Sequence, residues 1–306
     1  MTLQSLLESG ERPVVTGELA SVDGGGLPRV QALVDEMAPF VDAINATDNP
    51  AAHAHASNVA IAIAIAQCGA EPILQVVCRD KNRLAQQADI VGASMFGVRN
   101  ICALTGDDVT AGDEPEARRV FDLDGPQLVK VASGLGRGTY MSGRAIEPAP
   151  DLFVGAVENP FAPPLPYRVE RALIKSEAGA RFLQLQIGYH VERLEAFVAG
   201  CVEAGVTSTT ALLPTICLVK RAGALRFMDR EVPGISIPAA TIDRVDGAAD
   251  QAEEAYQLAL EQAQHALSLP GVSGIHLADF RHDGSLGRLV TDLGLADEQR
   301  GRRDAS

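Results

Sequence analysis

The chain contains no tryptophan, and aromatic residues make up only 4% of its 306 positions. Its hydrophobic content is nevertheless 46%, so alanine, valine, isoleucine and leucine must fill the core. Positive charge is also scarce, because 26 Lys and Arg residues stand against 40 Asp and Glu residues and leave a net charge of −14. This balance disfavours binding to nucleic acid or to an anionic membrane surface. We interpret the acidity as a contribution to solubility.

Signatures of several other protein classes are missing. The five cysteines form no Cys-x-x-Cys pair, which predicts reduced thiols and a cytoplasmic location. We expect no signal peptide and no membrane span, since the longest apolar run, Val59–Ala66, is too short to cross a bilayer. His53 and His55 lie near Asp48 without a third ligand at a known spacing, so no metal site is predicted. Neither a P-loop nor a spaced dinucleotide-binding glycine motif occurs.

Apolar runs of strand length alternate with segments of helical period. Strands separated by helices pair in parallel through right-handed crossovers. Eight such units predict a single α/β domain, a closed (βα)8 or TIM barrel, with an open doubly wound sheet as the alternative. The predicted strands are 13–18, 41–45, 73–78, 100–104, 152–157, 182–186, 208–213 and 273–277, and the predicted helices begin at Pro28, Asn58, Asn82, Gly125, Pro166, Val191 and Ile216.

We expect the barrel to occupy residues 1–296 and the charged segment 297–306 to be frayed. Two segments depart from the regular alternation. Residues 106–123 form a long polar loop, and residues 248–268 predict an extra helix inserted before the last strand.

Short polar clusters follow the predicted strands. Glu18 closes the first strand, and Asn45–Asn49, Cys78–Asn82 and Thr105–Asp108 follow the second, third and fourth. Gln184 and Gln186 lie on the sixth strand. Because the carboxyl ends of the strands form the catalytic face of a (βα)8 barrel, these clusters predict where the chemistry takes place.

Two carboxylates stand out among these clusters. Glu18 could be a general acid whose pKa is raised by apolar surroundings, or a glutamate that is paired or solvated in a loop. Gly106 permits a tight turn that directs Asp107 into the barrel mouth. Glu18 and Asp107 could therefore form a pair of carboxyl groups whose pKa values differ from each other. Arg79 could hold a phosphate or carboxylate, whereas the polar residues around it could merely cap turns and helices.

Taken together, these clusters resemble the methylenetetrahydrofolate reductase family from Glu18 to about Leu293. The most specific motifs are Asn45-Ala46-Thr47-Asp48-Asn49-Pro50, Cys78-Arg79-Asp80-Lys81-Asn82, Ala103-Leu104-Thr105-Gly106-Asp107 and the block from Lys175 to Gln186. The resemblance implies a (βα)8 barrel that reduces the methylene bridge of 5,10-methylenetetrahydrofolate to a methyl group. It also implies a tetrahydrofolate derivative as the small-molecule partner and leaves a homo-oligomer open.

The resemblance assigns roles to individual residues. Glu18 matches the glutamate that protonates the folate and opens its five-membered ring to an iminium cation. Asp107 matches an aspartate that favours this cation. The implied substrate-binding residues are Gln186, Asn45, Gln75 and Leu218, the last lying near a position where the family has a stacking Phe. The implied cofactor-binding residues are Thr47, Asp48, Arg79, Thr105 and Lys175.

The departures from the family pattern concern FAD. Thr105 stands where the family has an Arg, Gln75 where it has a His, and Arg168 where it has an Asp. The Tyr and His expected after the fifth strand are absent from residues 155–160, although Lys175 is kept. These departures argue against a tightly bound flavin. They favour direct hydride transfer from NADH or NADPH.

Two other functions remain open at this stage. One is a barrel methyltransferase or another pterin-dependent one-carbon enzyme. The other is a folate- or flavin-binding subunit without activity of its own. The pair Glu18 and Asp107 favours reduction, because methyl transfer from N5 needs no group that stabilises an iminium cation.

Overall fold

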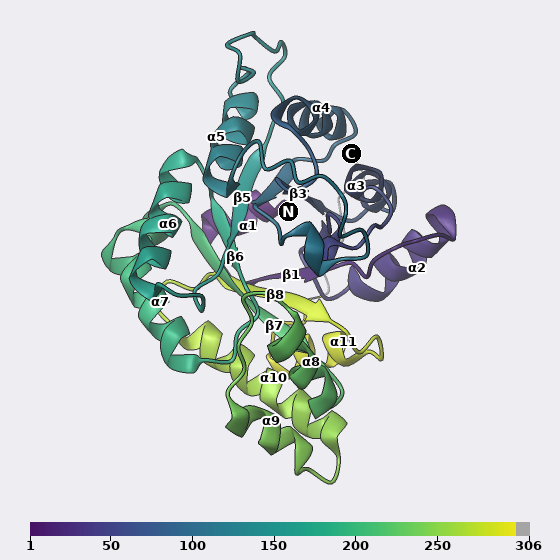
Figure 1. The fold of residues 1–306 in the computed structure, drawn as a ribbon, viewed down its shortest axis with the longest axis vertical. Coiled ribbons are helices and arrows are strands. Elements are labelled where there is room, and N and C mark those ends of the chain that lie inside the picture. Colours follow the sequence, from purple (N-terminus) through teal and green to yellow (C-terminus); the bar gives the residue numbers. More distant parts are fainter. Residues whose placement is uncertain (298–306) are drawn as a thin grey trace.

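The computed structural model describes residues 1–297, and eight parallel strands within them close into one barrel in sequence order (Figure 1). Each strand pairs with its neighbours in the chain, and β8 pairs with β1. The predicted closed barrel is confirmed, and the open sheet is excluded. The strands are β1 (Val14–Glu18), β2 (Ala43–Ala46), β3 (Pro72–Val77), β4 (Asn100–Leu104), β5 (Phe153–Glu158), β6 (Phe182–Leu185), β7 (Ala211–Leu218) and β8 (Gly274–Asp279).

Helices surround the strands and bury aliphatic side chains against them. Local sequence sets several helix ends. Asn82 accepts hydrogen bonds from two N–H groups of the first turn of α4, and Asp124 forms a capping box at the start of α5. The outer helices are α2 (Gly26–Met37), α3 (Asn58–Gln67), α4 (Arg83–Ser94), α5 (Gly125–Gly136), α6 (Leu165–Ala178), α7 (Val191–Glu203), α10 (Gln251–Ser268) and α11 (Ser285–Asp292).

The barrel interior is layered. The layer at the amino-terminal ends of the strands is apolar, and the short helix α1 (Leu3–Ser9) covers it with Leu3 and Leu6. Above it lies a layer of buried polar side chains, and the mouth of the barrel comes next. Side chains alternate between the interior and the helices along each strand, so one strand supplies every second residue to these layers.

The region between β7 and β8 differs from the prediction. A helix beginning at Ile216 is wrong, because β7 continues through Pro214 to Leu218. Proline is uncommon inside a paired strand, whereas the β-branched Thr215 and Ile216 that follow it suit one. The helix predicted over 248–268 is present as α10, but it is the helix that packs on β7 and β8.

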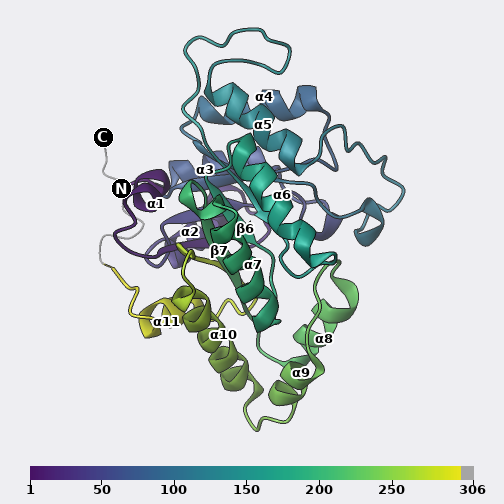
Figure 2. The same cartoon turned by 90° about the vertical axis from the view of Figure 1, so that its left-hand side faces the viewer.

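The additional elements before β8 are therefore α8 (Ala222–Glu231) and α9 (Ala239–Asp246). Both lie outside the ring of strands, toward the lower end of the molecule (Figures 1 and 2). None of the helices within residues 1–297 combines the length and apolar character needed to span a bilayer. The segment predicted to be frayed lies outside the described residues from position 298 onward.

Candidate active site

A closed network of polar side chains lies in the middle of the barrel. Asn45 and Gln184 exchange two hydrogen bonds of 2.7 and 3.0 Å between their amides. The Thr16 hydroxyl lies 2.9 Å from Nδ1 of His276, and the Gln184 amide nitrogen lies 3.3 Å from both of these atoms. Burial lowers the pKa of His276 to about 3, so its ring is neutral near pH 7. The network lies beneath the barrel mouth. The side-chain amide of Asn45, a predicted substrate-binding residue, is already hydrogen-bonded within it.

Glu18 lies directly above this network. It is two residues beyond Thr16 on β1, so its side chain is on the interior side of the strand. Burial raises its pKa to about 7, and a hydrogen bond with the Gln75 side chain acts in the opposite direction. Desolvation is the larger cause. A carboxylate that is removed from water loses more hydration free energy than one hydrogen bond with a neutral partner restores. Glu18 is thus a carboxylic acid that can hold or release a proton near pH 7.

A cavity of about 360 Å³ adjoins Glu18 on the side of α2 and α11. Glu36 and Phe40 line it from the α2 side, while Asp279 and His282 line it from the end of β8. A cavity of this size can hold several water molecules. Glu18 therefore has a route for proton exchange with water beside the mouth itself.

Asp107 follows β4, within range of the charge of Arg79. Gly106 has φ +87°, and an added Cβ there would collide with Val77, so the turn requires glycine. Burial raises the pKa of Asp107, and the charge of Arg79 offsets part of this effect. Arg79 is buried and binds Asp80 through two hydrogen bonds of 2.7 Å. The structure thus brings Arg79 and Asp107 together.

Asp48 belongs to the same side of the mouth. Its carboxylate accepts a hydrogen bond of 2.9 Å from the Val77 N–H group. Burial raises its pKa, whereas this hydrogen bond and the charge of Lys81 lower it. Thr47, the preceding residue, is half-buried after β2. Asp48 therefore helps to hold the end of β2 against β3.

Lys175 is engaged in a buried ion pair. Its ammonium group lies 2.5 Å from the Glu158 carboxylate and 2.5 Å from the Val157 carbonyl oxygen. Arg168 and Arg171 each approach the same carboxylate at 3.7 Å. Burial lowers the pKa of Lys175, and Glu158 counteracts this effect.

Thr105 lies beside this ion pair. Its hydroxyl accepts a hydrogen bond of 3.2 Å from the Gly125 N–H group at the start of α5, and Arg171 lies 3.5 Å away. The Arg168 guanidinium is held by the carbonyls of Ala162 and Pro163 at 2.7 and 3.1 Å. Thr105 and Lys175, two of the cofactor-binding residues that the resemblance implies, thus already have polar partners within the protein.

Gln186 and Leu218, two predicted substrate-binding residues, lie in different parts of the barrel. Gln186 follows β6 and is half-buried, and its side-chain oxygen accepts a hydrogen bond of 2.9 Å from the Ile187 N–H group. Leu218 is fully buried in the core between strands and helices. The structure therefore does not bring Leu218 to the mouth, because it lies on the outward-facing side of β7.

Sequence reasoning missed the roles of Glu158 and His276. The alternation along β8 places His276 on an interior position, a signal that could have been found. The pairing of Glu158 with Lys175 could not, because many acidic residues of this chain could serve as its partner. What the fold and the site define is a (βα)8 barrel with a carboxyl group of raised pKa at the carboxyl ends of its strands.

Comparisons with known proteins give the family. Residues 28–294 match methylenetetrahydrofolate reductase, and the chain belongs to this family, which confirms the resemblance seen in the sequence. It is 25% identical over 237 residues to a probable methylenetetrahydrofolate reductase (NADPH) of Caenorhabditis elegans. This match covers 74% of this chain and 33% of that protein. It is 24% identical over 240 residues to methylenetetrahydrofolate reductase 2 of Schizosaccharomyces pombe, covering 72% and 35%.

The chain spans about a third of the length of these curated relatives. Among solved structures, a protein from Clostridium thermocellum that binds two copies of 5-methyl-5,6,7,8-tetrahydrofolic acid is similar, with a TM-score of 0.65 and 14% identity. The match covers 95% of this chain and 98% of that protein. At this identity the likeness establishes the barrel fold.

Proposed function

We propose that this protein reduces 5,10-methylenetetrahydrofolate to 5-methyltetrahydrofolate with a hydride from NADH or NADPH. The observation that carries the proposal is Glu18, whose pKa of about 7 makes it a competent general acid at neutral pH. Family membership and the folate bound by the Clostridium thermocellum protein support the substrate class.

Glu18 provides the proton that the reaction needs. Protonation at N10 of the folate breaks the bond between N10 and the methylene carbon and leaves an iminium cation at N5. The hydride then adds to the methylene carbon and neutralises the cation. Asp107, in its ionised form, would stabilise the positive charge as it develops. Gln186 at the end of β6 would hydrogen-bond the pterin.

We further propose that the hydride passes directly from the nicotinamide to the folate. The residues present argue against FAD, because the Lys175 ammonium group is already held in a buried ion pair with Glu158 and Thr105 replaces a cationic side chain. A cofactor diphosphate that binds Lys175 would have to displace Glu158 from a buried ion pair, which costs free energy. No step of the proposed mechanism involves a flavin.

An absorbance spectrum of the purified protein, followed by an assay of NADH and NADPH oxidation without added flavin, tests both parts. We expect a colourless protein that oxidises the nicotinamide only when methylenetetrahydrofolate is present. Stoichiometric flavin with ping-pong kinetics would refute direct transfer and leave the reduction intact. Folate binding without turnover under any of these conditions would instead support a non-catalytic binding subunit.

A further inference from the structure

Phe280 is a large aromatic side chain that the protein leaves exposed at the end of β8. It follows Asp279, the last residue of the strand, and 59% of its surface is exposed. Its backbone N–H group donates a hydrogen bond of 3.0 Å to the Leu218 carbonyl oxygen. The strand pairing between β7 and β8 therefore still holds the backbone at Phe280.

The strand register places Phe280 above Glu18. Gly17 pairs with Leu277, so Glu18 lies beside Ala278 on the neighbouring strand. His276 faces the barrel interior. Phe280 lies one residue beyond the end of β8, but its backbone still pairs with β7, so the alternation of side chains assigns it to the same side as His276. Phe280 is two positions beyond Ala278, a rise of roughly 7 Å along the strand direction.

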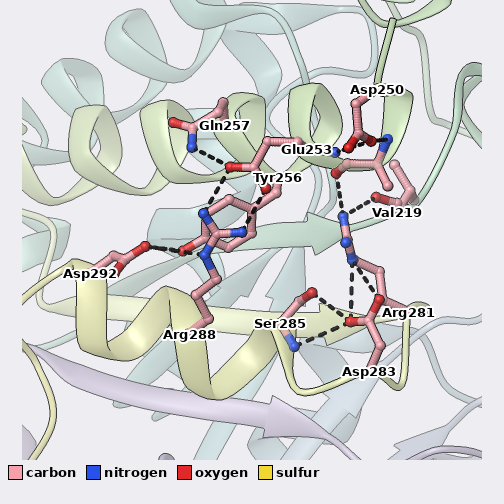
Figure 3. Close-up of polar contacts among 11 residues, drawn as sticks. Val219, Asp250, Glu253, Tyr256, Gln257, Arg281, Asp283, Ser285, Arg288 and Asp292 are labelled. Atoms are coloured by element: carbon pink, nitrogen blue, oxygen red, sulfur yellow. Dashed lines mark hydrogen bonds and ion pairs between the residues drawn. The ribbon is translucent and has the colours of Figure 1, made fainter.

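The segment after Phe280 is held firmly. The Arg281 guanidinium donates hydrogen bonds to the Val219 and Ala252 carbonyls at 3.2 and 2.7 Å and lies 3.3 Å from Asp283 (Figure 3). Only 8% of the Arg281 side chain is exposed. The Arg281 N–H group also donates to Asp279 at 2.8 Å. The exposed ring is thus presented by an ordered backbone, which limits the entropy lost when a ligand packs on it.

We infer that Phe280 is the aromatic surface on which the p-aminobenzoyl ring of the bound folate packs. This inference rests on the proposed function. The folate nitrogen that receives the proton carries the p-aminobenzoyl ring, so that ring must lie close to Glu18. A planar ring at the height of Phe280 satisfies this requirement, and aromatic pairs gain stability beyond the area they bury. Leu218 cannot take this role because it is fully buried.

The absence of tryptophan from the chain provides a direct test. In Phe280→Trp the new side chain is the single tryptophan and reports on contacts at this position. Phe96→Trp is the matched control, since Phe96 is 60% exposed and follows the C-terminal end of α4, at the opposite end of the barrel. Each variant is titrated with 5-methyltetrahydrofolate, and binding to both variants and to the unmodified protein is measured separately by equilibrium dialysis.

We expect the emission of Phe280→Trp to change saturably, with the dissociation constant found by dialysis, and that of Phe96→Trp to show no saturable change. Dialysis that shows binding while the Phe280→Trp emission stays constant would overturn the inference and leave the proposed function intact. A response to NAD⁺ but not to the folate would overturn it as well. If the unmodified protein binds no folate, both the inference and the proposed function fail.

Steady-state kinetics provide a second readout. Phe280→Ala should raise KM for methylenetetrahydrofolate about 2- to 10-fold, as expected for the loss of one aromatic contact. KM for the nicotinamide should be unchanged, and Phe280→Tyr should retain the wild-type value for the folate. An equal rise in both KM values would refute a specific contact with the folate.

Discussion

Replacing Glu18 by Gln should have opposite effects on activity and on stability. Glu18 has a pKa of about 7 in the folded protein against an ordinary value of 4.5. The folded state therefore binds the proton more tightly than the unfolded state, and stability falls as the pH rises between these two values. Each pKa unit is worth about 1.4 kcal/mol, so the ionised carboxylate costs about 3 kcal/mol above pH 7.

Glutamine is nearly isosteric with glutamate and carries no charge. We expect Glu18→Gln to have the wild-type free energy of unfolding near pH 4.5 and to exceed it by up to about 3 kcal/mol at pH 8. The same variant should lose about 10²- to 10⁴-fold in kcat, because Gln cannot donate the proton. Urea unfolding at a series of pH values, together with NADH oxidation, measures both effects.

Glu36→Gln is the matched control for this experiment. Glu36 lines the same cavity but is exposed, so its replacement should leave turnover unchanged and shift the free energy of unfolding by no more than about 0.5 kcal/mol. A stability difference between Glu18→Gln and wild type that is independent of pH would refute the raised pKa of Glu18. Wild-type turnover in Glu18→Gln would remove Glu18 from the mechanism.

Three further predictions concern the site. The value of kcat/KM should fall about tenfold per pH unit above about 7, because the protonated form of Glu18 is required; a flat profile from pH 6 to 9 would contradict this role. Asp107→Asn should impair folate turnover more than nicotinamide binding in steady-state kinetics, and the reverse order would mean that the pockets are wrongly assigned. Glu158→Gln should destabilise the protein by about 3–5 kcal/mol in urea unfolding, since it leaves Lys175 buried without its carboxylate partner. The double variant with Lys175→Met should recover much of this loss, and an additive loss would refute the explanation.

The sequence by itself determined a parallel α/β architecture and the strand ends at which its polar clusters lie. Strand-length apolar runs alternating with helical segments allow parallel pairing only, whereas the closure of the eight strands into a barrel was decided by the tertiary structure. Glu18 and Gly106-Asp107 could be recognised because each directly follows an apolar strand. These signals are local, since strand alternation, glycine turns and helix caps depend on neighbouring residues.

The tertiary structure decided which side chains remain open to a ligand. Asn45 finds its partner Gln184 across the barrel, 139 residues away in sequence, and Lys175 forms a buried ion pair with Glu158. Leu218 faces the helices because it occupies an outward-facing position of β7, and Phe280 is exposed directly after the end of β8. The raised pKa of Glu18 likewise comes from burial among several strands. Burial, charge pairing and the facing of a side chain depend on strand register and distant partners, which local sequence does not contain.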